Sequence, residues 1–273
     1  MRIMMLNQSP RNLNDPDDNE YHERVQAILN SYASPGAEVI LDYPDDHPGA
    51  AIARVMGKQG SRSELNYFTS AAALVRKAVW AEQNGFDAVI QSNNFEPGVE
   101  PSRFAVRIPV IGLCRATIHV AANYAERIGV TVPFDGYAPL TRRLLHAYGL
   151  EHHVTEVRTM SLDDVPHGDD VAKMRPIILE RAAEVMHALI EETGAECIVP
   201  LGGAVIPYIV DPKDLEREVG TVVYNPKVVG IRLAEMSAQF GYAQSDRTYA
   251  PTRLQDADFD ARLFTDAPVG APR

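Results

Sequence analysis

One loop of this chain places polar side chains directly after a short apolar segment. In residues 84–100 (NGFDAVIQSNNFEPGVE), the apolar segment 86–90 is too short for a helix and ends in the amide and hydroxyl side chains of residues 91–94. A Pro-Gly turn follows at residues 97–98. A strand that ends in such residues is typical of the opening of a binding site, so we expect chemistry at this point.

A similar phrase recurs at residues 193–207 (TGAECIVPLGGAVIP), again after an amphipathic segment. When the two copies are aligned on their shared Gly-x-acid-x-apolar-apolar start, Asn93 matches Gly202 and Asn94 matches Gly203. Ligands of open α/β sheets bind beyond the carboxyl ends of strands, so the duplication predicts one site shared by two half-domains. The alternative is that the two glycines only turn the chain.

Predicted strands alternate with predicted helices, which implies parallel sheets with right-handed crossovers. We expect strands at residues 2–6, 37–41, 86–90, 107–113, 128–132, 154–159, 197–201 and 222–223, and helices at 15–31, 64–83, 115–127, 140–147, 176–192 and 226–240, with a further short helix at 50–56. The helix at 64–83 would bury Leu65, Phe68, Ala72, Val75 and Val79. The predicted fold class is α/β with two similar lobes and a cleft between their strand ends. Residues 1–113 with 226–273 form one lobe, including an irregular arm at 243–273, and residues 114–225 form the other.

Composition excludes several kinds of partner. The 273 residues carry a formal net charge of −11, with a pI near 5.2, which argues against nucleic acid and against an anionic membrane surface. Cys114 and Cys197 have no metal-ligand spacing, and no GxGxxG, Walker, HExxH or GxSxG motif occurs. The N-terminus turns polar too soon for a signal peptide. We expect a cytoplasmic protein without a metal or a cofactor, with a small-molecule substrate and a possible homo-oligomeric state.

Five segments together resemble a known family: LNQSP after the first strand, GFDAVIQSNNFEPG, IPVIGLCRA, GVTVP and GAECIVPLGG. In this order they resemble the aspartate/glutamate/hydantoin racemase superfamily over residues 1–240. The resemblance implies two flavodoxin-like lobes that face each other across an active-site cleft, and a reaction that needs no cofactor. In the superfamily each lobe donates one cysteine, and the two thiols remove and return the proton α to a carboxylate or carbonyl group.

The cysteine positions of that family fall here on Asn93 and on Gly202, or on Gly203 if the loop is shifted by one. Neither an amide nor a glycine exchanges a proton at neutral pH, so we expect a mechanism without paired thiols. The resemblance still implies a pocket for a small carboxylate or carbonyl compound, in which backbone amides stabilise an enolate and the two glycines allow close approach. The implied substrate-binding residues are Asn7, Ser9, Asn93, Asn94, Phe95, Thr131, Gly202, Gly203 and Ala204.

Several side chains near the predicted site could take part in proton transfer, and each has an ordinary structural alternative. Cys114 is either a displaced thiol acid or base, or a small core residue. Glu96 is either a base whose pKa burial raises, or a solvated loop residue. His119 is either an acid or base, or a packing histidine. Tyr208 either donates to an oxyanion or fills the lobe interface, and Arg115 either pairs with a substrate carboxylate or lies on the surface.

The favoured function is therefore a cofactor-independent isomerase, a racemase or epimerase acting on a small carboxylate or cyclic amide through an enolate-like intermediate. A lyase that decarboxylates or cleaves a carbon-carbon bond, or a hydrolase, could use the same oxyanion pocket. A third alternative is a non-catalytic protein that binds small carboxylates. The acidic loops at residues 45–47 and 163–170 are expected to be solvated rather than cation-binding.

Overall fold

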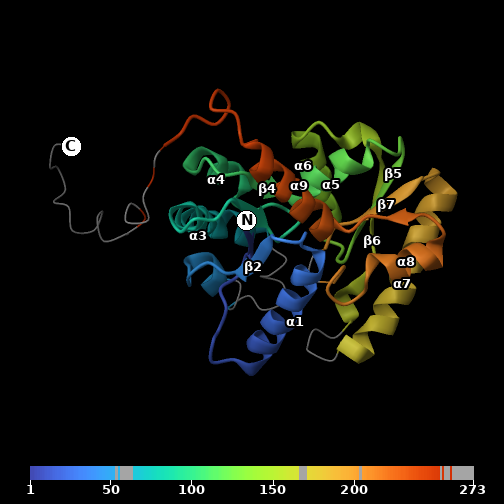
Figure 1. Cartoon of the computed structure of the whole chain (residues 1–273). Helices are drawn as coiled ribbons and strands as arrows, with labels where there is room; N and C mark the ends of the chain where they lie inside the picture. Colours follow the sequence, from blue (N-terminus) through green and yellow to red (C-terminus); the bar gives the residue numbers. More distant parts are fainter. Residues whose placement is uncertain are drawn as a thin grey trace.

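The computed structural model describes residues 1–52, 55, 64–165, 171–202, 205–252, 254 and 259, which contain two four-stranded parallel sheets (Figure 1). The first sheet has the order β2-β1-β3-β4 and consists of β1 (Arg2–Leu6), β2 (Glu38–Asp42), β3 (Ala88–Gln91) and β4 (Val110–Gly112). The second has the order β6-β5-β7-β8 and consists of β5 (Ile128–Val132), β6 (Val154–Thr159), β7 (Cys197–Pro200) and β8 (Val222–Val223). The predicted α/β fold with two parallel sheets is confirmed.

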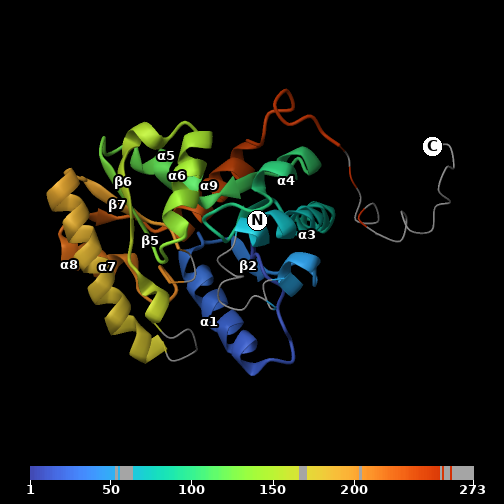
Figure 2. The ribbon, with the colours of Figure 1, turned by 180° about the vertical axis from the view of Figure 1, so that it is seen from behind.

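Helices cover both faces of each sheet (Figures 1 and 2). On the first sheet, α1 (Pro16–Tyr32) and α9 (Pro226–Phe240) lie on one face, while α3 (Glu64–Gln83) and α4 (Val99–Ala105) lie on the other. On the second sheet, α5 (Leu113–Ala121) and α6 (Tyr137–Ala147) lie opposite α7 (Val171–Thr193) and α8 (Pro212–Val219), with short 3₁₀ turns η1 (Glu151–His153) and η2 (Leu162–Asp164). Alternate residues of β1 supply the two cores of the first lobe: Ile3 and Met5 face α1 and α9, whereas Met4 and Leu6 face α3.

The two sheets share one strand order when each is counted from its own first strand, which confirms the internal duplication. An acidic residue makes the same contact in both copies. The Asp87 carboxylate accepts a hydrogen bond from the N–H of Arg2 at 2.7 Å, and the Glu196 carboxylate accepts one from the N–H of Glu126 at 2.8 Å. In each sheet the acidic residue directly before the third strand, β3 or β7, is hydrogen-bonded to the backbone near the start of the first strand, β1 or β5.

Some element boundaries differ from the predictions. Residues 99–105, where no helix was predicted, form α4, with Pro101 in the first turn, where its missing N–H costs little. The acidic segment 212–219 forms α8. The helix expected at residue 176 begins at Val171, and β4 is short because α5 starts directly at Leu113. Because α5 contacts β4, β7 and α9, the division of the chain at residues 113/114 and 225/226 stays a prediction.

The predicted buried face of α3 is confirmed at Val75 and Val79 and is wrong at Leu65, Phe68 and Ala72. Leu65 and Phe68 are 50% and 77% exposed, whereas Tyr67 and Leu74 are buried. Ser70 also lies on the buried side, where its hydroxyl donates to the carbonyl of Tyr67 and accepts from the Gln8 side chain. Because the polar Ser70 lies on the core face, the buried residues of α3 do not form a continuous apolar stripe in the sequence.

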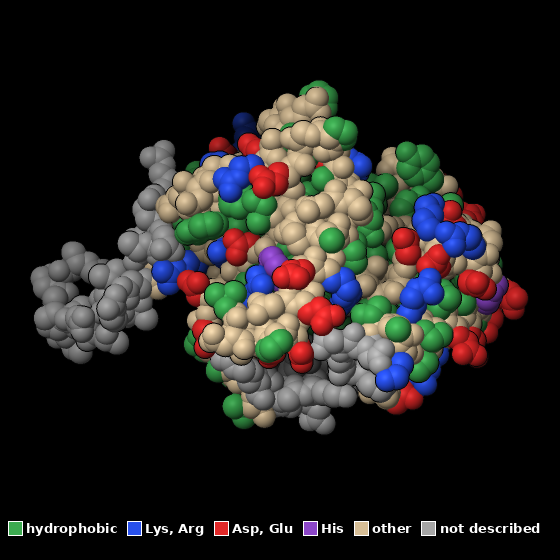
Figure 3. All heavy atoms as spheres, turned by 60° about the horizontal axis from the view of Figure 1, so that its bottom comes forward, with side chains coloured by type: hydrophobic (Ala, Val, Ile, Leu, Met, Phe, Trp, Pro, Cys, Tyr) green, Lys and Arg blue, Asp and Glu red, His purple; other side chains and the backbone are tan. Residues whose placement is uncertain are grey.

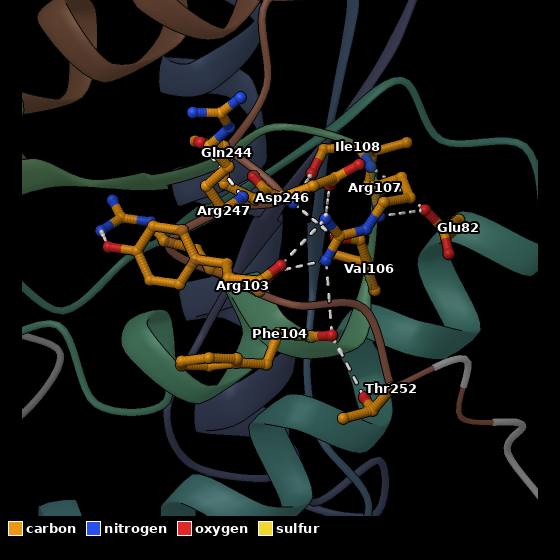
Figure 4. Close-up of polar contacts among 12 residues, drawn as sticks. Glu82, Arg103, Phe104, Val106, Arg107, Ile108, Gln244, Asp246, Arg247 and Thr252 are labelled. Carbon is orange, nitrogen blue, oxygen red and sulfur yellow. Dashed lines mark hydrogen bonds and ion pairs between the residues drawn. The ribbon is translucent and has the colours of Figure 1, made fainter.

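The first part of the predicted irregular arm packs on the body, against α4 and the chain that follows it (Figure 4). Gln244 donates to the carbonyls of Val106 and Ile108, and Thr252 donates to the carbonyl of Phe104. The rest of the arm, apart from residues 254 and 259, lies outside the described residues. Of the short helix expected at 50–56, residues 50–52 and 55 are helical, and residues 53, 54 and 56 lie outside the described residues.

Acidic and basic side chains are interspersed on the face shown in Figure 3, so the negative net charge is not concentrated in one patch there. Within the described parts of the chain, no helix combines the length and the apolar composition of a membrane span. Within the same residues, no three His, Cys, Asp or Glu side chains are grouped so as to hold a metal ion. The cytoplasmic location stays a prediction.

Candidate active site

Asn93 lies at one of the two positions where the family resemblance predicts a thiol. Its side chain already makes hydrogen bonds within the protein. Its Nδ2 donates to Oε1 of Gln8 at 2.6 Å, and its Oδ1 accepts from the N–H of Phe95 at 2.9 Å. The backbone N–H of Asn93 donates to Oε1 of Gln91 at 3.0 Å. The N–H groups of Asn93 and Phe95 are thus consumed inside the loop, and the prediction that both serve as oxyanion donors is wrong.

Three buried polar side chains near the strand ends have no such partners. In Asn94, which is 1% exposed, neither Nδ2 nor Oδ1 makes a hydrogen bond, and the same holds for Oγ1 of Thr131 on β5 and the hydroxyl oxygen of Tyr67 on α3. Burial raises the pKa of Tyr67, so its hydroxyl stays protonated and able to donate. Buried polar atoms are nearly always satisfied, so Asn94 and Thr131 are positions at which a ligand or water would complete the hydrogen bonding.

An aromatic cluster joins the two lobes beside these atoms. The ring of Phe95, after β3, lies 5.6 Å from the ring of Tyr67 and 4.4 Å from that of Tyr137, measured between centroids. Tyr137 in turn packs edge-on against Phe134, which follows β5. Phe95 is therefore a buried packing residue that connects the first strand-end loop to the second lobe.

Glu96 is buried, not solvated. Its carboxylate accepts hydrogen bonds from the hydroxyl of Tyr148, at the end of α6, and from the N–H of Arg115, in the first turn of α5, at 2.9 Å. Burial raises the pKa of Glu96, while these donors and the Arg103 guanidinium act in the opposite direction. The contacts give Glu96 the role of a cap on α5, and its predicted role as a base stays a prediction.

Both cysteines are core residues. Cys114 is fully buried in the first turn of α5, and burial raises the pKa of its thiol well above the ordinary value. Burial likewise raises the pKa of Cys197, at the start of β7, to about 11. Since the thiolate is the reactive form, neither environment favours acid–base chemistry near neutral pH.

Lys227 was missed by the sequence analysis. It lies in the first turn of α9, is 0% exposed, and donates from Nζ to the carbonyl and, at 3.0 Å, to the hydroxyl of Ser92, the first residue after β3. Burial lowers the pKa of Lys227 to about 7. The ring of Tyr208 lies 5.2 Å from Nζ, and its buried hydroxyl makes no hydrogen bond. Helical periodicity was the available signal, because Lys227 shares the buried stripe of Ile231 and Ala234.

Gly202 does not leave open space for a ligand. A β-carbon at this residue would lie 2.6 Å from Cδ of Pro133, which follows β5. The glycine is therefore needed for packing between β5 and β7, and the expectation that it admits a close ligand is wrong. Gly203 and Ala204 lie outside the described residues.

The sequence profile of the family described as "Asp/Glu/Hydantoin racemase" matches residues 19–234. This chain belongs to that family. It is 30% identical over 177 residues to a hydantoin racemase of Rhizobium meliloti, covering 64% of this chain and 70% of the relative. A hydantoin racemase of Pseudomonas sp. (strain NS671) is 24% identical over 200 residues, covering 73% of this chain and 78% of the relative.

The fold of this racemase-family protein is also found among solved structures. Allantoin racemase from Klebsiella pneumoniae superimposes with a TM-score of 0.76 at 20% identity, covering 93% of this chain and 95% of that protein. The membership and the shared fold identify the chain as a racemase-type isomerase by family.

Other residues predicted for the racemase site lie elsewhere or are used otherwise. Ser9 is exposed, and the Oδ1 of Asn7 accepts from the N–H of Gln8 at 2.8 Å. His119 is exposed on α5 and, with Arg103 and Arg115, lines a surface hollow of about 330 Å³. Partial desolvation and the nearby Arg115 lower the pKa of His119. No described contact joins these residues to Asn94 or Thr131, and a role for them in binding or catalysis stays a prediction.

Proposed function

We propose that this protein racemises or epimerises a small cyclic amide of the hydantoin type, without a cofactor and without paired thiols. The observation that carries the proposal is that polar side chains of both lobes, Asn94 after β3 and Thr131 on β5, keep buried atoms without hydrogen-bond partners. The activity for which the relatives are named, hydantoin racemase, supports the same substrate class.

The neutrality of these groups favours a ring amide over a free amino acid. An Asn side chain both donates and accepts, as a hydroxyl does, which matches the adjacent C=O and N–H of a cyclic amide or imide. A substrate α-carboxylate would instead be expected to meet a cation. The guanidinium groups beside the first loop are otherwise engaged: that of Arg115 lies over the ring of Tyr148, and that of Arg103 donates to the carbonyl of Val110.

The reaction would proceed through an enolate. When the proton leaves the ring carbon next to the carbonyl, negative charge develops on the carbonyl oxygen. Donors placed for that oxygen, such as Nδ2 of Asn94 or Oγ1 of Thr131, would stabilise the transition state more than the ground state. The apolar rings of Phe95 and Tyr137 would exclude water from the same region.

Proton NMR in deuterium oxide with enantiopure 5-monosubstituted hydantoins tests the proposal. We expect deuterium at the ring α-carbon together with loss of optical rotation, and we expect iodoacetamide to leave the rate unchanged because both thiols are buried. The Asn94→Ala variant should lose exchange by roughly 100-fold, as removal of one oxyanion donor does.

Other outcomes would replace the proposal. A new product formed from a hydantoin or a substituted malonate would identify a hydrolase or a lyase. Thermal stabilisation by hydantoins or carboxylates without exchange would identify a binding protein. Neither binding nor exchange with any of these compounds would overturn the proposed substrate class.

A further inference from the structure

The ammonium form of Lys227 has little to stabilise it. Of the charged side chains that the structure describes, none pairs with Lys227, and its hydrogen bonds go only to Ser92, a neutral residue. Lys227 also lies in the first turn of α9, where the helix dipole presents its positive end. Burial and the helix terminus both favour the free amine, in agreement with the lowered pKa of about 7.

This amine lies against the loop where the chemistry is expected. Ser92 follows β3 directly and precedes Asn93, the position of one missing thiol, and Asn94, whose amide is buried without partners. Asn93 cannot take over proton transfer because its side chain is bonded to Gln8 and to the backbone of Phe95. Lys227 is thus a titratable group in hydrogen-bond contact with the strand end.

The neighbouring titratable groups do not neutralise Lys227. Tyr208 stacks on it with a pKa raised well above the ordinary value, so this phenol stays neutral. Tyr21 of α1 packs edge-on against Tyr208, with its own pKa raised to about 12, and Arg24 of α1 donates to the carbonyl of Tyr208. The carboxylate of Glu96, in the same loop as Ser92, accepts hydrogen bonds from the N–H of Arg115 and the hydroxyl of Tyr148.

We propose that Lys227 is the acid–base residue that replaces a thiol in this protein, transferring the α-proton of the bound cyclic amide. This inference rests on the proposed function. The C–H bond breaks, its electron pair enters the enolate of the adjacent carbonyl, and the proton moves to Nζ. The carbonyl and hydroxyl of Ser92 accept hydrogen bonds from the resulting ammonium, which can return a proton only to the face it was taken from. Racemisation follows when solvent water protonates the opposite face of the enolate and Nζ gives its proton back to solvent, so no oxidant, reductant or cofactor is consumed.

The ring of Tyr208 covers the amine, so the substrate reaches Nζ only when this ring turns aside. The same cover excludes water, which would otherwise solvate the ammonium and raise its pKa.

The test compares wild type, Lys227→Met and the surface control Lys213→Met by deuterium exchange of a 5-monosubstituted hydantoin. Binding is measured separately with 5,5-dimethylhydantoin, which has no α-proton. We expect Lys227→Met to bind this analogue but to lose exchange by about 100-fold or more, the usual contribution of a positioned base. Lys213, which is exposed on α8, should be replaceable without effect.

The pH profile supplies a second measurement in case Lys227→Met fails to fold. In wild type the exchange rate should rise with pH and level off near pH 7, as the amine loses its proton. Ser92→Ala removes one acceptor from the ammonium, so the midpoint should move to lower pH by roughly half a unit. Exchange in Lys227→Met at the wild-type rate, or a midpoint that Ser92→Ala leaves in place, would overturn the role of Lys227. Absence of exchange in wild type would instead count against the proposed function.

Discussion

The backbone N–H of Arg115 donates a hydrogen bond to the carboxylate of Glu96 at 2.9 Å, so a residue of the β3 loop caps α5 from outside that helix. The residue in the N-cap position, Gly112, has no side chain with which to cap. A β-carbon on Gly112 would collide with the Glu96 carboxylate. The glycine and the remote acid are therefore two parts of one helix cap.

This relationship predicts that the two positions are coupled. Glu96→Ala should cost about 1–3 kcal/mol, because a helix cap and buried hydrogen bonds are lost. Gly112→Ala should cost a similar amount in the wild type, because it displaces the carboxylate, and clearly less in the Glu96→Ala background. Urea unfolding of the two single variants and the double variant measures the coupling. Additive losses would contradict a shared cap.

Glu96 should also make stability depend on pH. Burial raises its pKa in the folded state, so as pH rises above the ordinary Glu pKa the unfolded chain releases this proton before the folded chain does. The folded state then binds more protons, and stability falls as pH rises through the raised folded pKa. Glu96→Gln removes this contribution, so wild type should lose stability relative to the variant over that window. Urea unfolding from pH 4 to pH 8 tests it, and a constant difference between the two proteins would refute it.

We predict that the unsatisfied hydroxyl of Thr131 lowers the stability of the fold and contributes to ligand binding. Its buried hydroxyl has no partner, whereas the hydroxyl of Thr141, also buried, donates to the carbonyl of Tyr137 at 2.8 Å. Thr131→Val should leave stability unchanged or raise it by up to about 2 kcal/mol, and Thr141→Val should lower it by about 1 kcal/mol. Binding of 5,5-dimethylhydantoin should weaken only in Thr131→Val. The same sign of stability change in both variants would argue against an unsatisfied hydroxyl at Thr131.

Gly202 is predicted to be needed for packing. Gly202→Ala places a methyl group 2.6 Å from the Pro133 ring and should cost about 1–3 kcal/mol, the usual penalty for overpacking. Gly136→Ala is the matched control, since nothing lies within 4 Å of the β-carbon it would add and its φ of −63° suits any residue. Thermal unfolding of both variants measures the difference. Equal stability of the two variants would show that the loop after β7 has room at Gly202.

Local sequence patterns were enough to predict most of the fold. Strands β1, β5 and β6 and helices α3 and α9 lie at the predicted residues, because apolar runs and helical periodicity act over a few neighbouring residues. The repeated Gly-x-acid phrase predicted two lobes of equal topology. Side-chain orientation was less accessible: Phe68 was expected in the core and is 77% exposed, because the polar Ser70 on the buried face disguised the helical stripe.

What the sequence by itself determined is the family and the duplication, since both can be read from residue types in order; the placement of the two thiol positions on Asn93 and on Gly202 or Gly203 stays a prediction. The tertiary structure alone decided which groups are free to act. Asn93 is locked by Gln8 and Asn94 is left unpartnered, although the two are adjacent in the chain. Lys227 donates a hydrogen bond to Ser92, which lies 135 positions earlier in the sequence, and the burial of Lys227 lowers its pKa. Hydrogen-bond satisfaction and desolvation depend on neighbours that are distant in sequence, so they emerge only when the chain is folded.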